Sequence, residues 1–170
     1  GRQTAMSFDG PDAVSIPPQT MVQALNFPDG PDDHAAISAL RIALKDPQNS
    51  RVLRAAQDVV TLLAAQDVYM DDLRPEHAPP ALWLRFAEGT RGSAISAIGG
   101  VYDEAALEVA AHLMRGDEIF RDTAHHFLRH YDVTLSRLIP ELDDELIAAL
   151  ADTRSSRAFM LLGRVTGIFD

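Results

Sequence analysis

The stretch from Asp117 to Leu138 constrains the fold more than any other part of the chain, because it carries a continuous helical stripe of apolar residues. Gly116 suits the end of a preceding helix, Asp117 suits an N-cap, and Pro140 prevents the helix from continuing. At about 100° per residue, the apolar side chains share one quadrant of a helix and should face a core. They are Phe120, Ala124, Phe127, Leu128, Tyr131, Leu135 and Leu138. The sequence therefore predicts that this helix is the centre of the fold.

The chain after residue 33 is helical in pattern throughout, and no useful stretch alternates as a β-strand does. We expect Ser50 and Asp152 to serve as helix caps, and Pro80 to lie in the first turn of a helix that ends before Gly89. The other expected helices lie over 36–46, 50–66, 93–98, 103–115, 143–151 and 153–166. The prediction is all-α: a single-domain bundle of about seven or eight helices over residues 34–170.

Residues 1–33 differ from the rest, because they hold five of the ten prolines together with several Gly and Asp residues. Such a composition favours turns and extended chain over helix. We interpret this segment as an irregular N-terminal tail that adds little to the core. Its apolar residues are nevertheless able to anchor it on a surface: Ile16, Met21, Val22, Leu25 and Phe27.

Composition narrows the possible partners and cofactors. The net charge of −10 disfavours nucleic acid and anionic membranes, and a chain without cysteine has no disulfide or thiolate chemistry. No apolar run is long enough to span a membrane, and the N-terminus lacks the apolar core of a signal peptide. We therefore expect a cytoplasmic protein with no cofactor and no membrane association.

A metal site is the first candidate for chemistry. Asp122, His126 and His130 follow one another at four-residue intervals on the central helix, and Glu108 and His112 are spaced the same way on the preceding one. Imidazole and carboxylate ligands suit zinc or iron. However, successive members drift by about 40° around the helix, so two of the three would normally reach one ion. Surface histidines paired with carboxylates are the alternative, and no metal is firmly predicted.

Phosphotransfer is the second candidate, because the stretch 124–129 resembles the region around the phosphorylated histidine of histidine-phosphotransfer domains and sensor-kinase dimerisation helices. His126, Leu128 and Arg129 fill the histidine, apolar and basic positions. The resemblance implies a phosphohistidine at His126. His130 stands where phosphotransfer domains have a small residue, and Phe127 stands where sensor kinases have an acidic one.

A loop offers the third candidate, as a surface for a partner or ligand. Residues 68–80 contain three prolines and are expected to be non-helical, and loops of this kind often carry function. The candidate residues are Asp71, Asp72, Arg74, Trp83 and Arg85. The alternative is a structural loop in which Asp71 or Asp72 pairs with an arginine.

Two further patterns bear on binding. A turn at Gly99-Gly100 resembles that of a helix-turn-helix motif, but the following helix carries Asp103, Glu104 and Glu108, which would repel phosphates. Gly163 and Gly167, spaced four apart, permit close helix packing within one chain or between two.

No nucleophile motif or phosphate-binding loop accompanies the histidines, so the sequence favours a protein without enzymatic activity. The first hypothesis is a helical protein-interaction domain that binds a protein partner or itself as a homodimer, through the tail or the last helix. The alternative is a histidine-centred site around His126, either a phosphohistidine carrier or a metal-binding bundle.

Overall fold

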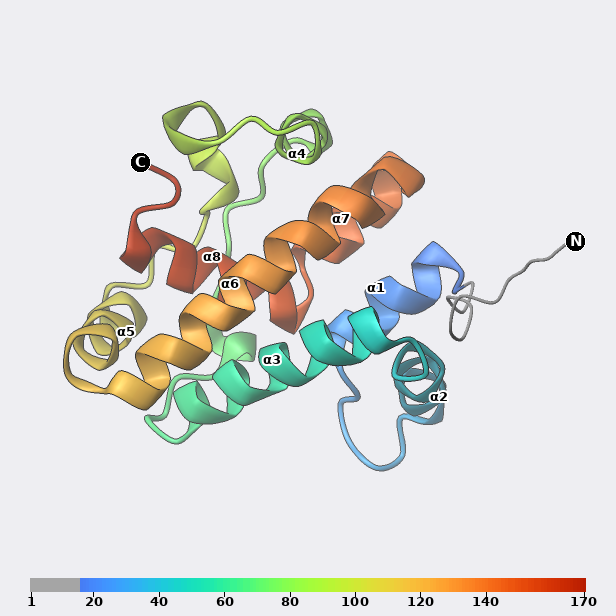
Figure 1. The fold of residues 1–170 in the computed structure, drawn as a ribbon, viewed down its shortest axis with the longest axis horizontal. Coiled ribbons are helices and arrows are strands. Elements are labelled where there is room, and N and C mark those ends of the chain that lie inside the picture. Colours follow the sequence, from blue (N-terminus) through green and yellow to red (C-terminus); the bar gives the residue numbers. More distant parts are fainter. Residues whose placement is uncertain (1–15) are drawn as a thin grey trace, which may run out of the picture.

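The computed structural model describes residues 16–170, and within this range it contains helices and connecting loops but no strand (Figure 1). Eight α-helices and three short 3-10 helices follow one another in these residues: α1 (Pro18–Asn26), α2 (His34–Ala43), α3 (Pro47–Ala64), η1 (Met70–Asp72), α4 (Pro80–Ala87), η2 (Gly92–Ile98), α5 (Glu104–Gly116), α6 (Glu118–Leu138), η3 (Ile139–Glu141), α7 (Asp144–Ala151) and α8 (Arg154–Thr166). The prediction of an all-α bundle with about seven or eight helices is confirmed.

Side-chain caps start most of the α-helices. An oxygen of Asp117 accepts a hydrogen bond from the Phe120 amide at 2.9 Å, as the sequence predicts for the start of α6. Two predicted caps were wrong by a few residues. Asp46 rather than Ser50 caps α3, because Pro47 already fits its first turn, and Thr153 rather than Asp152 caps α8.

The predicted central helix α6 is the longest described, with 21 residues. Its entire apolar stripe, from Phe120 to Leu138, is buried, which confirms the predicted core face. Figure 1 shows α6 beside α3 along one side of the bundle, and these two helices share the largest contact between any two elements of the described range. On the opposite face of α6, Ile119, Asp122, Arg129 and Val133 are exposed.

Helix α8 runs through the interior, and its residues from Ala158 to Gly163 are all buried. The Tyr131 hydroxyl on α6 and the Ser156 hydroxyl on α8 share a buried hydrogen bond of 2.6 Å. Burial raises the pKa of Tyr131 to about 12. A buried hydrogen bond of this kind fixes the register of the two helices.

The two glycines of the last helix are used within the chain. Gly163 lies under the Phe169 ring, which would overlap any Cβ at that position. Gly167 ends α8 in the left-handed conformation at φ 81°, which turns the chain back toward the helix. The expected close approach is therefore made by the C-terminal residues of the same chain rather than by another helix.

Helix α1 lies in the segment where the sequence analysis expected turns and extended chain, and that expectation was wrong for Pro18–Asn26. Pro18 occupies the first turn, where a missing amide hydrogen costs nothing. Met21, Val22 and Leu25 are buried, so the expected apolar anchors do meet the core. Residues 1–15 of the predicted tail lie outside the described residues.

None of the helices found between residues 16 and 170 combines the length and the apolar character needed to cross a membrane.

Candidate interaction surface

Two of the three histidines of α6 form a pair. The rings of His126 and His130 lie 4.3 Å apart between centroids, at an angle of 57°. Burial lowers the pKa of His130, and the electrostatic influence of His126, Arg51 and Arg129 lowers it further. His130 is therefore less readily protonated than an ordinary histidine.

The structure does not bring the five predicted metal ligands together. Glu108 and His112 line a separate surface hollow of about 440 Å³ next to Gln66 and Arg115 on the α5 side, and the residues lining it include neither His126 nor His130. Asp122 is exposed on α6. Among residues 16–170, no three His, Asp or Glu side chains are grouped closely enough to hold a metal ion.

The residues of the predicted loop surface likewise lie at separate places in the structure. Trp83 is buried on α4, and its indole nitrogen has no hydrogen-bond partner among the described residues. Asp72 lines a hollow near Asp103, whereas Arg74 and Arg85 are exposed. Asp71 accepts hydrogen bonds from Arg154, which hold the pKa of this carboxyl below its usual value. Asp71 therefore pairs with an arginine, which is the alternative given above for this loop.

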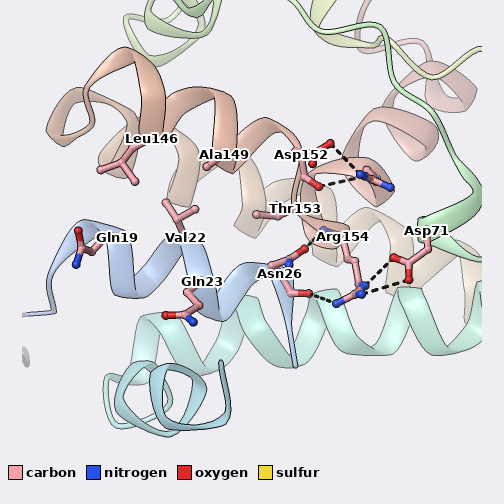
Figure 2. Close-up of a pocket in the computed structure, with 11 residues that line it drawn as sticks. Gln19, Val22, Gln23, Asn26, Asp71, Leu146, Ala149, Asp152, Thr153 and Arg154 are labelled. Carbon is pink, nitrogen blue, oxygen red and sulfur yellow. Dashed lines mark hydrogen bonds and ion pairs between the residues drawn. The ribbon is translucent and has the colours of Figure 1, made fainter. Parts of the chain in front are cut away.

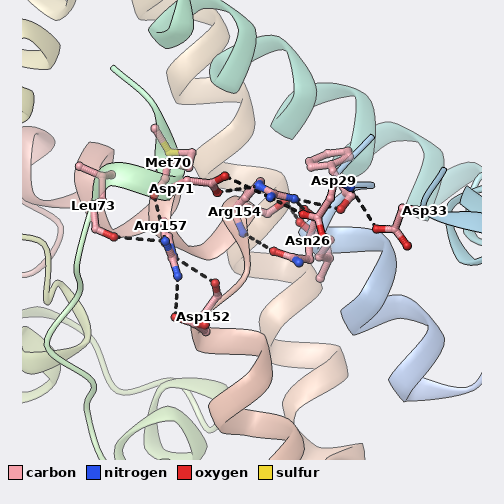
Figure 3. Close-up of polar contacts among 12 residues, drawn as sticks. Asn26, Asp29, Asp33, Met70, Asp71, Leu73, Asp152, Arg154 and Arg157 are labelled. Carbon is pink, nitrogen blue, oxygen red and sulfur yellow. Dashed lines mark hydrogen bonds and ion pairs between the residues drawn. The ribbon is translucent and has the colours of Figure 1, made fainter. Parts of the chain in front are cut away.

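Arg154 is the centre of a polar cluster that the sequence analysis did not identify (Figures 2 and 3). Its guanidinium donates to the main-chain oxygens of Asn26 and Phe27 at 2.9 and 3.1 Å, and it pairs with Asp29 and Asp71 at 2.5 and 2.8 Å. Each guanidinium nitrogen therefore has at least one acceptor.

The cluster borders a surface hollow of about 500 Å³ between α1, α7 and the start of α8 (Figure 2). On its other side, Arg157 donates to the main-chain oxygens of Met70 and Leu73 and pairs with Asp152 at 2.8 Å (Figure 3). Because both guanidinium groups are occupied by the chain itself, this hollow offers little charge to a ligand. We interpret the cluster as a structural tie between α1, the η1 loop and α8.

An apolar groove of about 700 Å³ lies beside α6. Leu128 is nearly buried, whereas Val133 and Ile168 expose 60% and 37% of their surface. The groove is lined by Phe86, Arg91, His125, Leu128, Arg129, Asp132, Val133, Thr166 and Ile168. Segments from α4, the start of η2, α6 and the C-terminus therefore build one surface.

Charged side chains border this groove. Arg91 lies over the Phe86 ring at 3.7 Å and pairs with Asp132 at 2.8 Å, so these two charges balance each other. Among residues 16–170, Arg129 forms no ion pair, and its exposed side chain leaves a positive charge at the groove edge. Among the described residues, the groove thus combines a mainly apolar lining with one cation, Arg129, that forms no ion pair.

This surface was not predicted from the sequence, although one signal was present. Val133 is an apolar residue outside the stripe of α6, on the side that the helical pattern assigns to solvent. Exposed apolar side chains are common singly, so Val133 alone would not identify a site. Its neighbours Phe86 and Ile168 come from distant parts of the sequence and are joined to it only by the fold.

No protein-family model, curated protein or solved structure matches this chain.

Proposed function

We propose that this chain is a helical protein-interaction domain that binds a polypeptide in the groove beside α6. The observation that carries the proposal is the apolar groove itself, in which Val133 and Ile168 remain exposed next to the nearly buried Leu128. Covering apolar surface contributes about 25 cal/mol per Å². Elongated apolar grooves between helices commonly receive a helix from a partner.

The groove is built on rigid elements, which favours its use in recognition. Leu128 belongs to the buried stripe of α6, and Phe86 packs edge-on against the Phe159 ring of α8 at 6.0 Å. The Arg91 guanidinium is held by Asp132 and by the main-chain oxygen of Phe86. A surface fixed in this way loses little side-chain entropy when a partner binds.

Binding without catalysis is part of the same proposal. The one hydroxyl that lines the groove belongs to Thr166, and it donates to the Leu162 carbonyl of its own helix at 2.8 Å. The alternative of a histidine-centred site at His126 has weaker support, because the His130 ring lies against His126 and because Glu108 and His112 line another hollow.

Self-association and a cytoplasmic location complete the proposal. The sequence hypothesis placed a homodimer contact on the tail or the last helix, but the face of α8 around Gly163 is covered by its own Phe169. Thr166 and Ile168, at the end of the chain, line the groove instead. We therefore propose the groove as the contact surface.

Site-directed photo-cross-linking tests the binding function. A photoreactive residue is placed at Val133 in the full chain, and a matched control is placed at Ile119, which is 74% exposed on the same helix. We expect one defined polypeptide to be captured at Val133 and not at Ile119. Once purified, that polypeptide should bind the Ile168→Asp variant at least about tenfold more weakly. No adduct at Val133, or the same adducts at both positions, would contradict the proposal.

A further inference from the structure

The charge of this acidic protein is distributed unevenly. Residues 34–57, which form α2 and the first half of α3, and residues 123–138 of α6 together hold six of the fifteen basic residues but only two of the 25 acidic ones. One of the two is Asp46, which is buried as the cap of α3, and the other is Asp132, which pairs with Arg91. A chain with a net charge of −10 therefore concentrates positive charge in these segments.

The packing of α3 beside α6 brings several of these basic residues together (Figure 1). Arg137, near the end of α6, donates to the side-chain oxygen of Asn49 in the first turn of α3 at 3.1 Å, so the two helices are antiparallel. Arg51 follows Asn49 by two residues and lies close enough to His130 to act on it electrostatically, and Arg54 lies one turn further along α3. We call this surface the cationic face, and it consists of Arg51, Arg54, His126, His130 and Arg137.

The arginines of the cationic face have no acidic partner among residues 16–170. Arg51, Arg54 and Arg137 are exposed, and none of them forms an ion pair in this range. Arg137 donates to neutral amide side chains, which do not balance its charge. The exposed carboxylates of the same two helices, Asp58 and Asp122, lie beyond the face, toward the end of α3 and the start of α6. An exposed guanidinium group without an acidic partner can bind a carboxylate from another molecule.

The cationic face is separate from the apolar groove. His126, His130 and Arg137 do not line the groove, whereas Asp132 does. At about 100° per residue, each of these three residues lies more than about 100° around α6 from Asp132. The groove is therefore on one flank of α6, and the cationic face is on the flank next to α3.

We infer that the cationic face binds an acidic segment of a partner polypeptide, in addition to the proposed binding in the groove. Opposite charge identifies the partner, because three arginines without acidic partners attract carboxylates and repel other cations. Arginine also binds carboxylate groups with paired hydrogen bonds, which adds a geometric preference to the attraction.

The surroundings of the face favour an acidic polypeptide over a nucleic acid. The exposed tyrosines of residues 16–170 are Tyr69 and Tyr102, which lie outside α3 and α6, so the face offers no tyrosine, phenylalanine or tryptophan on which bases could stack. The rest of the chain has nine basic and 23 acidic residues, which repel a long polyphosphate that extends past the face. A short acidic segment is confined to the face and avoids this repulsion.

Fluorescence anisotropy on the full chain tests the inference, with a labelled peptide of about ten residues in which glutamate and alanine alternate as the probe. At about 50 mM salt we expect a Kd below about 100 µM, and about 300 mM salt should weaken binding at least about tenfold. The double variant Arg51→Glu, Arg54→Glu should also bind at least about tenfold more weakly. The matched control is Arg74→Glu, Arg85→Glu, which changes the net charge equally at two exposed arginines outside the face and should retain binding. Circular dichroism verifies that both variants are folded.

Three outcomes would overturn the inference. They are no binding of the peptide by the unchanged chain, equal losses in the two double variants, and binding of a single-stranded oligonucleotide of similar length as tightly as the peptide. Equal losses would mean that net charge, and not this face, determines the affinity. Because the cationic face and the groove are separate, cross-linking at Val133 tests the proposed function independently.

Discussion

Helices α6 and α8 pack against each other in one core, yet they meet their surroundings differently. Helix α8 contacts α1, α3, α5, α6 and α7, and its middle residues are buried on every side. Helix α6 buries one stripe and leaves the side that carries Arg129 and Val133 open. A helix that is apolar on all sides lies in the interior, whereas a helix that is apolar on one side leaves its other side available to a partner.

The difference is a reason to place the proposed contact on α6 rather than on the last helix. The sequence of α8 has glycines spaced for close helix contact, but the chain covers Gly163 with its own C-terminal Phe169. Helix α6 lacks any such motif, and its open face is bordered by side chains from other elements, including Phe86 and Ile168. The groove is therefore formed by several segments that are distant in the sequence.

The largest expected effect is the loss of core packing in α8. The Phe159 ring is fully buried and lies within 6.0 Å of the rings of Phe86, Tyr131 and Phe169. Phe159→Ala should lower the free energy of unfolding by about 3–5 kcal/mol, and Phe127→Ala in the buried stripe of α6 should do the same. Val133→Ala on the open face should change it by less than about 0.5 kcal/mol. Urea denaturation measures all three, and a loss below about 1 kcal/mol for either phenylalanine would refute the assigned core.

The next effect concerns the close approach at Gly163. A methyl group there would overlap the Phe169 ring, so Gly163→Ala should destabilise the fold by about 1–3 kcal/mol. Gly116 at the end of α5 has open space around its Cβ position, and Gly116→Ala should be neutral or stabilising by up to about 1 kcal/mol. Thermal unfolding compares the two variants. Equal effects would mean that Phe169 does not cover α8.

A smaller effect is expected at the polar tie of α8. Because Arg154 lowers the pKa of Asp71 in the folded chain, a proton binds more readily to this carboxyl in the unfolded chain. The stabilisation is therefore present above about pH 4, the ordinary pKa of aspartate, and is lost as pH falls through the lowered folded value. Asp71→Asn should cost about 1 kcal/mol or less at pH 7, with the difference shrinking toward pH 3. Asp72→Asn is the control, because Asp72 is the adjacent aspartate and forms no ion pair among residues 16–170. A difference that persists at pH 3 would argue against the pair.

The smallest effect is expected at the histidine pair of α6. The pKa of His130 is lowered in the folded chain, so protonation favours the unfolded chain and stability falls as pH drops below about 6.5. His130→Gln should flatten this decline between pH 7 and about pH 5. Denaturant titrations at several pH values measure the slopes. Equal slopes for the unchanged chain and His130→Gln would contradict the assigned environment.

Much of the fold could be predicted from local patterns. The stripe of α6 and its Asp117 cap depend on residues within a few positions of one another, and both are confirmed. Helix α1 was missed because Pro17 and Pro18 suggested a break, whereas a proline in the first turn fits a helix start. Local signals therefore succeed except where one residue type permits two structures.

The candidate surfaces depend on contacts that local patterns do not contain. Arg154 reaches Asp71 and Asn26 across 83 and 128 residues of sequence, and neither separation leaves a periodic signal. The groove likewise joins Phe86, Val133 and Ile168. The spacing of Asp122, His126 and His130 was visible in the sequence, but the other predicted ligands, Glu108 and His112, line a different hollow.

The molar mass of the Val133→Asp variant tests most directly whether the open face of α6 binds a second copy. A carboxylate at this position would place a charge in an apolar contact, while Ile119→Asp changes a similarly exposed apolar residue that does not line the groove. Light scattering at about 50 µM should give the mass of two chains for the unchanged protein and for Ile119→Asp, and the mass of one chain for Val133→Asp. A two-chain mass for folded Val133→Asp, or a one-chain mass for the unchanged protein, would contradict this assignment.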